Sequence, residues 1–180
     1  MQIQPKEEKE ALEALELNKH METAQRPSWD EYFMTLSKLA AIMATCPKRH
    51  VGSVIVKNKR VLTTGYNGAP PGLPHCTEVG CLIFEDEGSS CRRVLHSEQN
   101  AILQDSRNVE GATLYTSYLP CVDCMKEIVS VKIAEVVYEE EYPGTKPRYT
   151  HAKEFAQGTN VRLRKIPPVN VTEILSQYSS

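Results

Sequence analysis

The order of apolar segments along the chain is the strongest constraint on its fold. Two β-branched segments, 51–56 and 60–65, are separated only by a short Lys-Asn-Lys turn, which predicts a β-hairpin. Periodicity then alternates, with helices expected near 96–105, 121–131 and 150–156, and strands near 112–118, 134–138 and 161–164. This alternation predicts an α/β protein, a three-layer α/β/α domain with a central mixed sheet of about five strands.

The predicted domain covers residues 26–165. It starts with a helix whose expected apolar face contains Trp29, Phe33, Leu36, Ala40 and Met43. It includes a Cys-, Pro- and Gly-rich insertion at 69–93, and loops of this length are usually functional or held by another interaction. Residues 1–25 are expected to be a charged extension that forms a frayed, solvated helix, with a partner-binding helix as the alternative. Residues 166–180 are expected to be a loosely attached tail.

Composition excludes several classes of protein. The chain has 180 residues and a net charge of −2, so it lacks the basic field typical of nucleic-acid and membrane-surface binding. No apolar segment approaches the roughly 20 residues that a membrane span needs, and the first residues do not resemble a secretory signal. Six cysteines in such a chain indicate metal ligands or catalytic thiols. We therefore expect the protein in the cytoplasm, or in the host cytoplasm if it is viral.

The segment PCVDC contains a C-x-x-C motif made by Cys121 and Cys124. It lies where a strand is expected to pass into a helix, and a helix N-terminus lowers the pKa of a thiol there. Positions i and i+3 lie near one face of the first turn, so both sulfurs are available to one zinc ion. By itself the motif is equally compatible with a redox pair or with two buried cysteines.

A second segment, VLHSEQNAIL, supplies His96 and Glu98. One imidazole and two thiolates would give zinc three protein ligands and leave its fourth position for water, as in catalytic sites. If a helix starts at His96, the metal lies off the helix end, so His96 binds it while Glu98, which is not a ligand, reaches the water.

The order H-x-E followed by P-C-x-x-C resembles the signature of zinc-dependent nucleobase deaminases. In such a site zinc lowers the pKa of its water. Glu98 is then expected to carry the water's proton to a ring nitrogen and a proton to the leaving amine. Backbone N–H groups near Ser97 are expected to bind an oxygen of the base.

From Arg26 to about Arg164 the chain resembles the deoxycytidylate (dCMP) deaminases, a family with the cytidine-deaminase-like fold. The resemblance rests on RPSWDEYFM, TCPKRHVGSVIVKNKRVLTTGYNGAPPGLPHC, HSEQNAI, GATLYTSYLPCVDCMKEIV and VVYEEEYPG. The common family motif is HAE, so Ser97 is a departure. The resemblance implies hydrolysis of dCMP to dUMP and ammonia, which would supply dUMP for thymidylate synthesis.

Further expectations come from the same resemblance. The asparagine of GYNG, which contacts the deoxyribose in the family, corresponds to Asn67, although Asn67-Gly68 is also typical of an ordinary turn. Family members commonly form homohexamers, and many are activated by dCTP and inhibited by dTTP, with Mg²⁺ accompanying the triphosphate. Lys48, Arg49 and Arg107 match positions that handle phosphates or subunit contacts, and solvated surface cations are the alternative.

Four cysteines remain outside the first site. Some microbial and viral relatives hold a second, structural zinc in this region. By resemblance, Cys46, Cys76 and Cys91 are the preferred ligands here, with His75 or Cys81 as the fourth. A closed four-ligand site would stabilise an insertion with little apolar material of its own. Free buried cysteines are the alternative.

Three other classes of function fit the sequence less well. A zinc-held nucleic-acid-binding module should display clustered basic and aromatic residues, which a mildly acidic chain with 7% aromatic residues does not suggest. Deaminases of tRNA adenosine or polynucleotide cytosine would need a basic groove, and a free-cytidine deaminase usually has cysteine in place of His96. A catalytically inactive regulatory homologue is disfavoured because His96, Glu98, Cys121 and Cys124 are all present.

Overall fold

A computed structural model of the protein describes residues 9–10, 12–15, 26–83, 91–142 and 147–178. The chain forms two compact units, one of Trp29–Val169 and one of Met1–Ser28 with Asn170–Ser180. In the smaller unit, α7 (Val171–Ser176) is capped by Asn170, whose side chain accepts a hydrogen bond from the Glu173 backbone. Most of the predicted extension 1–25 and residues 84–90 of the predicted insertion lie outside the described residues.

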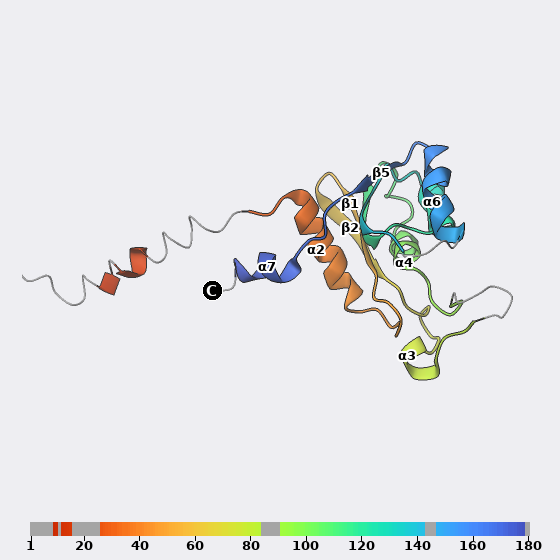
Figure 1. The fold of residues 1–180 in the computed structure, drawn as a ribbon, viewed down its shortest axis with the longest axis horizontal. Helices are drawn as coiled ribbons and strands as arrows, with labels where there is room; N and C mark the ends of the chain where they lie inside the picture. Colours follow the sequence, from red (N-terminus) through yellow and green to blue (C-terminus); the bar gives the residue numbers. More distant parts are fainter. Residues whose placement is uncertain (1–8, 11, 16–25, 84–90, 143–146, 179–180) are drawn as a thin grey trace, which may run out of the picture. The chain divides into compact units, whose positions relative to one another are not determined.

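The larger unit is built on one five-stranded sheet with the order β2-β1-β3-β4-β5 (Figure 1). β1 pairs antiparallel with both β2 and β3, whereas the β3–β4 and β4–β5 pairs are parallel. The strands are β1 (Gly52–Lys57), β2 (Arg60–Tyr66), β3 (Thr113–Tyr118), β4 (Glu135–Glu140) and β5 (Arg162–Lys165). The predicted hairpin and the predicted mixed sheet of about five strands are therefore confirmed.

Helices cover both faces of the sheet (Figure 1). Val54 and Val56 point into a cluster with side chains of α2, whereas Ile55 between them points into the larger cluster on the opposite face. This alternation follows from the two-residue period of a strand. The helices are α2 (Trp29–Ala41) on the first face, α4 (Ser97–Gln104), α5 (Val122–Ser130) and α6 (Pro147–Gln157) on the second, and α3 (Cys76–Val79) in the insertion. The predicted three layers are confirmed.

The buried face of α2 differs from the predicted one. Trp29 and Met43 are 39% and 62% exposed, whereas Ser37 is fully buried. The Ser37 hydroxyl donates a hydrogen bond of 2.8 Å to the carbonyl of Gly52, and a Cβ at Gly52 would lie only 1.9 Å from the Ser37 carbonyl oxygen. Because the helix contacts the strand backbone so closely, its small and polar residues face the sheet. Met43 lies beyond the end of the helix.

The segment that follows β5 is held on the larger unit as far as Val169. The backbone N–H of Val169 donates to the carboxylate of Glu139 at 2.7 Å, and Lys38 donates to the Val169 carbonyl, also at 2.7 Å. Lys38 also forms an ion pair of 2.8 Å with Glu139, whose side chain is almost fully buried. None of the helices in the described part of the chain has the length and apolar character of a membrane span.

A glycine on β2 sets how closely α4 approaches the sheet. A Cβ at Gly65 would lie 2.2 Å from the carbonyl oxygen of Ser97 and 2.4 Å from the backbone nitrogen of Ala101. Both are backbone atoms of one helix, so a side chain can be accommodated only if the helix moves. Gly65 therefore fixes the position of the helix turn that carries His96 and Glu98.

We predict that Gly65→Ala lowers the free energy of unfolding by about 1–3 kcal/mol or more, as expected for overpacking in a close contact. Denaturant unfolding of purified variants measures this change. Gly158→Ala is the matched control, because its Cβ would meet only the Phe155 carbonyl oxygen at an ordinary 3.6 Å. Equal stability of Gly65→Ala and Gly158→Ala would contradict the close contact between β2 and α4.

Candidate active site and metal centre

The candidate site is built from the N-termini of two helices. His96 is the N-cap of α4, and Cys121 is the N-cap of α5 and lies three residues after the end of β3. Cys124 follows in the first turn of α5 and is fully buried. An isolated pair of backbone hydrogen bonds between Gly68 and Leu95 holds the residue before His96 beside the end of β2. The predicted placement of His96, Cys121 and Cys124 at helix N-termini is what the structure shows.

The three donor atoms lie at ligand–ligand distances. The Nδ1 atom of His96 is 3.5 Å from the sulfur of Cys121 and 3.3 Å from that of Cys124, and the two sulfurs are 3.6 Å apart. With zinc–sulfur and zinc–nitrogen bonds of about 2.3 and 2.0 Å, tetrahedral geometry separates neighbouring ligands by about 3.5–3.8 Å. The donor set and its spacing therefore fit a zinc ion with three protein ligands.

The thiols of this site are strongly coupled. The hydrogen bond between Cys121 and Cys124 lowers the pKa of Cys121, burial opposes this change, and His96 lowers the pKa further. The same contact with Cys121, together with burial, raises the pKa of Cys124. Two neighbouring thiolates repel each other in a buried site, so a divalent cation is what allows both to be deprotonated.

Glu98 is a buried carboxylate directed toward the metal ligands. Its side chain belongs to a residue that is 5% exposed, and its Oε2 atom is 3.9 Å from the Cys124 sulfur. Burial raises the pKa of Glu98, against the opposing positive charge of His96. A carboxyl group with a raised pKa can both accept and release a proton near neutral pH. Such a group is suited to acid–base chemistry at the metal.

Two consecutive hydrogen bonds orient the carboxylate of Glu98. The hydroxyl of Ser97 donates to Glu98 Oε2 at 3.1 Å, and the hydroxyls of Ser97 and Ser53 are 2.8 Å apart. Both serines are completely buried. The Ser97 hydroxyl thus contacts the carboxylate, while the Ser97 backbone N–H lies among the donors of the first helical turn that have no intrahelical partner. Binding of a base oxygen by that N–H stays a prediction.

Asn67 connects β2 to the segment before β1. It is 7% exposed, and its side-chain oxygen accepts a hydrogen bond of 2.8 Å from the Val51 backbone. Its amide nitrogen donates to the Arg49 carbonyl at 2.9 Å. Because Gly68 is bonded to Leu95, the structure brings Asn67 close to the metal ligands. The deoxyribose contact stays a prediction.

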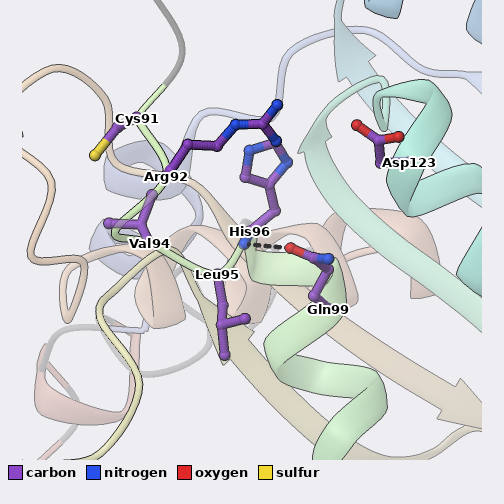
Figure 2. A pocket seen from close by; sticks show the side chains of 7 residues that line it. All are labelled: Cys91, Arg92, Val94, Leu95, His96, Gln99 and Asp123. Carbon is purple, nitrogen blue, oxygen red and sulfur yellow. Dashed lines mark hydrogen bonds between the residues drawn. The ribbon is translucent and has the colours of Figure 1, made fainter. Parts of the chain in front are cut away.

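A hollow of about 250 Å³ lies beside His96. Figure 2 shows the side chains that line it, which include several that the sequence did not single out: Arg92, Val94, Leu95, Gln99 and Asp123. The Gln99 side chain accepts a hydrogen bond of 3.0 Å from the His96 backbone and donates one of 2.6 Å to Glu127. Gln99 therefore ties the start of α4 to α5. The sequence could have indicated this role, because a glutamine three residues after a helix N-cap is typical of a capping box.

A group of aromatic residues around Arg49 was also not predicted. The guanidinium of Arg49 lies 5.1 Å from the ring centroid of Tyr118 and 5.0 Å from that of Tyr142. The two rings stack at 4.8 Å, and Tyr142 stacks on Tyr149 at 4.2 Å. Tyr118 ends β3 and precedes Cys121 by three residues. Its position in the SYLPC segment was therefore the available indication that an aromatic side chain lies near the metal ligands.

The other two predicted phosphate-handling cations are Lys48, which directly precedes Arg49, and Arg107. Lys48 is exposed, and its charge acts on the thiol of Cys81. Arg107 is exposed and follows α4 at the end opposite His96, about 12 Å away along an eight-residue helix. The structure therefore does not bring Arg107 to the metal ligands. Its allosteric role, like that of Lys48, stays a prediction.

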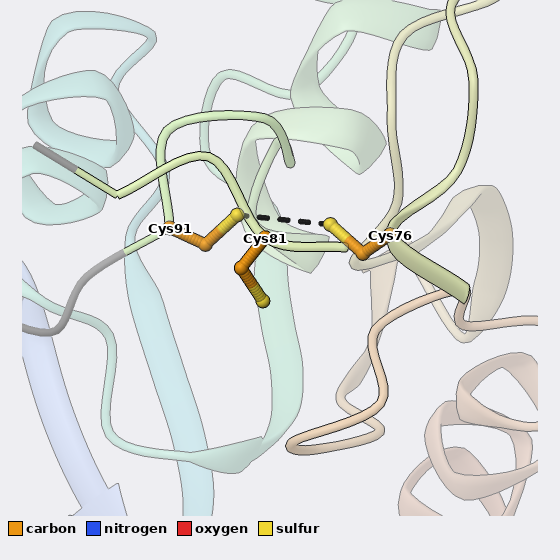
Figure 3. Close-up of side chains that lie close together, drawn as sticks. All are labelled: Cys76, Cys81 and Cys91. Carbon is orange, nitrogen blue, oxygen red and sulfur yellow. Dashed lines mark hydrogen bonds between the residues drawn. The ribbon is translucent and has the colours of Figure 1, made fainter. Parts of the chain in front are cut away.

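A second cluster of cysteines lies in the insertion (Figure 3). The thiols of Cys76, Cys81 and Cys91 lie within 4.8 Å of one another, with 3.6 Å between the sulfurs of Cys76 and Cys91. Burial raises the pKa of Cys76 to about 12. Burial also acts to raise the pKa of Cys91, but backbone groups of Arg93 and Leu82 outweigh it and lower that pKa. All six cysteines of the chain are free thiols.

The two remaining predicted ligands lie at the edge of this cluster. Cys46 is buried and close enough for its charge to act on Cys76 and Cys81, but it is not among the three thiols that lie within 4.8 Å of one another. His75 has a buried Nδ1 atom without a hydrogen-bond partner among the described residues. Cys81, rather than Cys46, therefore completes the close group with Cys76 and Cys91.

Comparison with known proteins places this arrangement in a family. Residues 27–140 match the family model described as the cytidine and deoxycytidylate deaminase zinc-binding region. ComE operon protein 2 of Bacillus subtilis is 39% identical over 145 residues, which are 79% of this chain and 73% of that protein. The deoxycytidylate deaminase of Schizosaccharomyces pombe is 42% identical over 154 residues, 81% of this chain but only 46% of that enzyme.

A solved structure agrees with the sequence relatives. The dCMP deaminase of cyanophage S-TIM5, determined in complex with dCMP and dUMP, is 32% identical and superposes with a TM-score of 0.65. The match covers 79% of this chain and 99% of the phage chain. The fold, the two helix N-termini with their three metal ligands, and these matches lead to one conclusion: the chain belongs to the zinc-binding cytidine and deoxycytidylate deaminase family.

Proposed function

We propose that this protein catalyses the hydrolytic deamination of dCMP to dUMP and ammonia. The observation that carries the proposal is the buried carboxylate of Glu98, 3.9 Å from a sulfur of the three-ligand group at two helix N-termini. The relatives named deoxycytidylate deaminase, and the phage enzyme bound to dCMP and dUMP, support this substrate.

The roles of the residues follow from their positions. His96, Cys121 and Cys124 would hold zinc, which when bound lowers the pKa of a coordinated water to near neutrality. Glu98 accepts a proton from the water and delivers it to N3 of the cytosine ring, while the water oxygen bonds to C4. Glu98 then conveys the second proton to the exocyclic amine, the C4–N bond breaks, and ammonia leaves. Ser97 keeps the carboxylate oriented during both transfers.

We predict that Glu98→Gln retains zinc and lowers dCMP turnover at least 10²–10⁴-fold, the usual contribution of a general acid–base group. Metal analysis and steady-state kinetics on the same preparations measure both quantities. Glu110→Gln is the matched control, because Glu110 is an exposed glutamate that pairs with Lys132 on the surface.

The kinetic assay should include CMP, deoxycytidine and dCTP beside dCMP. Wild-type protein that holds zinc but converts another of these substrates in preference to dCMP would contradict the proposed substrate. Undiminished turnover by Glu98→Gln would instead contradict the role of the carboxylate. The two failures are therefore distinguishable.

We also propose that the insertion holds a second, structural zinc. Cys76, Cys81 and Cys91 supply three close sulfurs, and we assign Cys46 as the fourth ligand because its charge acts on two of them. His75, with its unpartnered buried nitrogen, is the alternative fourth ligand. A closed site of this kind would stabilise a segment whose apolar residues are largely exposed, namely Leu73, Val79, Leu82 and Ile83.

We predict two zinc ions per chain in the wild type and one in Cys81→Ser, with a lower melting temperature because a structural zinc contributes directly to folding. Inductively coupled plasma analysis and thermal unfolding measure these effects. Cys46→Ser and His75→Gln identify the fourth ligand, since only the true ligand should weaken retention of the second ion. One zinc in the wild type would refute the structural site.

We further propose that the enzyme is a cytoplasmic homohexamer that supplies dUMP for thymidylate synthesis and responds to dCTP and dTTP with Mg²⁺. Six free thiols suit a reducing compartment. Apolar side chains exposed on α2 and just after it suit a subunit contact: Tyr32, Leu39, Ile42 and Met43. Exposed Lys48 and Arg107 are the proposed contacts of the triphosphate or of a neighbouring subunit.

We predict that dCTP with Mg²⁺ raises the initial rate at low dCMP and that dTTP with Mg²⁺ lowers it. Light scattering on a sizing column should give the mass of six chains. Arg107→Gln should weaken both responses while leaving the rate without effectors unchanged, because Arg107 lies far from the metal ligands. Rates that do not respond to either nucleotide would exclude the regulatory part of the proposal.

A further inference from the structure

Two cysteines of the insertion face each other across a short gap. The sulfurs of Cys76 and Cys91 are 3.6 Å apart and point toward one another, whereas the sulfur of Cys81 points away from the gap between them (Figure 3). A disulfide needs two sulfurs about 2.0 Å apart, and rotation of the side chains can bring sulfurs in van der Waals contact to that distance. Cys76 and Cys91 are therefore placed to form a covalent bond with each other.

The two sulfurs differ in their access to solvent. Cys91 is half-buried, whereas Cys76 is a buried residue of the short helix α3. Backbone groups of Leu82 and Arg93 bond to the Cys91 sulfur, which keeps it facing Cys76. A small oxidant in the solvent can therefore reach Cys91 and find a second thiol directly beside it. Partly exposed thiols next to a second thiol are typical sites of reversible oxidation.

The cysteines of the catalytic group are less accessible. Cys121 and Cys124 are both almost completely buried at the start of α5. An oxidant that comes from the solvent therefore meets the insertion before it meets these two thiols. Oxidation of the insertion can then occur while the catalytic ligands stay intact.

Cys91 is connected to the catalytic group by a short segment. It precedes His96 by five residues, and both side chains line the hollow of about 250 Å³ (Figure 2). Within this segment, Leu95 pairs with Gly68 at the end of β2. A covalent bond at Cys91 would draw one end of the segment toward α3. Misplacement of a catalytic group by about 1 Å can lower a rate about 10²-fold.

We propose that Cys91 is a site of reversible oxidation by peroxide, and that its disulfide with Cys76 lowers catalysis at His96. The Cys91 sulfur attacks one oxygen of hydrogen peroxide, the O–O bond breaks, and a water molecule leaves with the thiol proton. The Cys76 sulfur then attacks the sulfur of the resulting sulfenic acid, the S–O bond breaks, and a second water molecule leaves. The two thiols lose two electrons, and the peroxide is reduced to two water molecules.

The disulfide would be transient in a reducing compartment. Thiol–disulfide exchange with cellular thiols restores both cysteines, and disulfides of intracellular proteins are usually of this transient, redox-sensing kind. A zinc ion held by these thiols would be released on oxidation, because zinc binds thiolates and the disulfide removes two of them. The insertion would thus exchange a metal link for a covalent one.

The first test needs no substrate. Full-length, zinc-loaded protein is treated with hydrogen peroxide, its remaining thiols are alkylated after denaturation, and its peptides are mapped by mass spectrometry. We expect a disulfide between Cys76 and Cys91 that dithiothreitol removes, at peroxide concentrations that leave Cys121 and Cys124 unoxidised. A disulfide that includes Cys81, or earlier oxidation of the catalytic cysteines, would overturn the inference.

Two variants separate the pair from the rest of the cluster. Cys76→Ser should retain a sulfenic acid on Cys91, which dimedone labels, because the thiol that resolves it is gone. Cys81→Ser is the matched control, since it removes one thiol of the same cluster but leaves the pair. It should still form the disulfide. Absence of the dimedone label on Cys91 in Cys76→Ser would show that Cys91 is not the attacked sulfur and would overturn the inference.

A kinetic measurement tests the link to catalysis, and this part of the inference rests on the proposed function. Peroxide should lower dCMP turnover by wild type about 10- to 100-fold in step with disulfide formation, and dithiothreitol should restore it. Cys91→Ser, compared with its own untreated rate, should resist the same treatment. Disulfide formation without a change in turnover would overturn the link. Reduced wild type that forms the disulfide but does not deaminate dCMP would instead contradict the proposed function alone.

Discussion

The site depends on the convergence of two helix N-termini at one edge of the sheet. His96 and Cys121 are both N-cap residues, so their side chains project from helix ends where unpaired N–H groups and the helix dipole favour negative charge. This environment favours the thiolate of Cys121, whereas the neighbouring Cys121 charge and burial keep Cys124 protonated until a cation binds. The distance between the two helix ends is set by backbone packing, in which Gly65 allows α4 to lie directly on β2. The positions of the metal ligands are therefore set by the packing of α4 and α5 on the sheet.

The cysteine cluster of the insertion and the catalytic group share a structural element. Cys91 lines the same hollow as His96 and precedes it by only five residues (Figure 2). The segment between them pairs with Gly68 through Leu95 but contributes no fully buried apolar side chain. A metal bound by Cys91 would therefore restrain the segment that delivers His96. Through this connection, the proposed structural zinc would affect the geometry of the catalytic site.

The features that the sequence predicted are those determined by short-range patterns. The hairpin, the alternating helices and strands, and the three-ligand group with Glu98 all follow from periodicity or from spacing within one helix turn. The buried face of α2 could not be predicted because it depends on the contact between Ser37 and the backbone of Gly52, fifteen residues away. Residues that share no local pattern, such as Arg49 and Tyr142, meet only after the chain has folded.

Short-range patterns also could not identify the cysteines of the second cluster that lie closest together. The sequence favoured Cys46 with Cys76 and Cys91 and left Cys81 as one of two choices for the fourth ligand, because the insertion has no regular period that relates these positions. The structure brings Cys81 into the close group through the short helix α3 and the turn at Gly80, whose φ of 79° is a conformation that favours glycine. A backbone conformation of this kind is set by one residue but changes the direction of the chain that follows it.

The distribution of charge on the protein favours a small anionic substrate over an extended polyanion. Several cations of the larger unit are already paired with carboxylates, among them Lys38 with Glu139, Lys132 with Glu110, Lys153 with Glu141 and Arg164 with Asp30. With a net charge of −2, the chain has no broad positive field to attract an extended polyanion. Recognition of the proposed anionic substrate would then depend on local charges. Local charges suit a mononucleotide such as the proposed dCMP, whereas a polynucleotide would need a continuous basic groove.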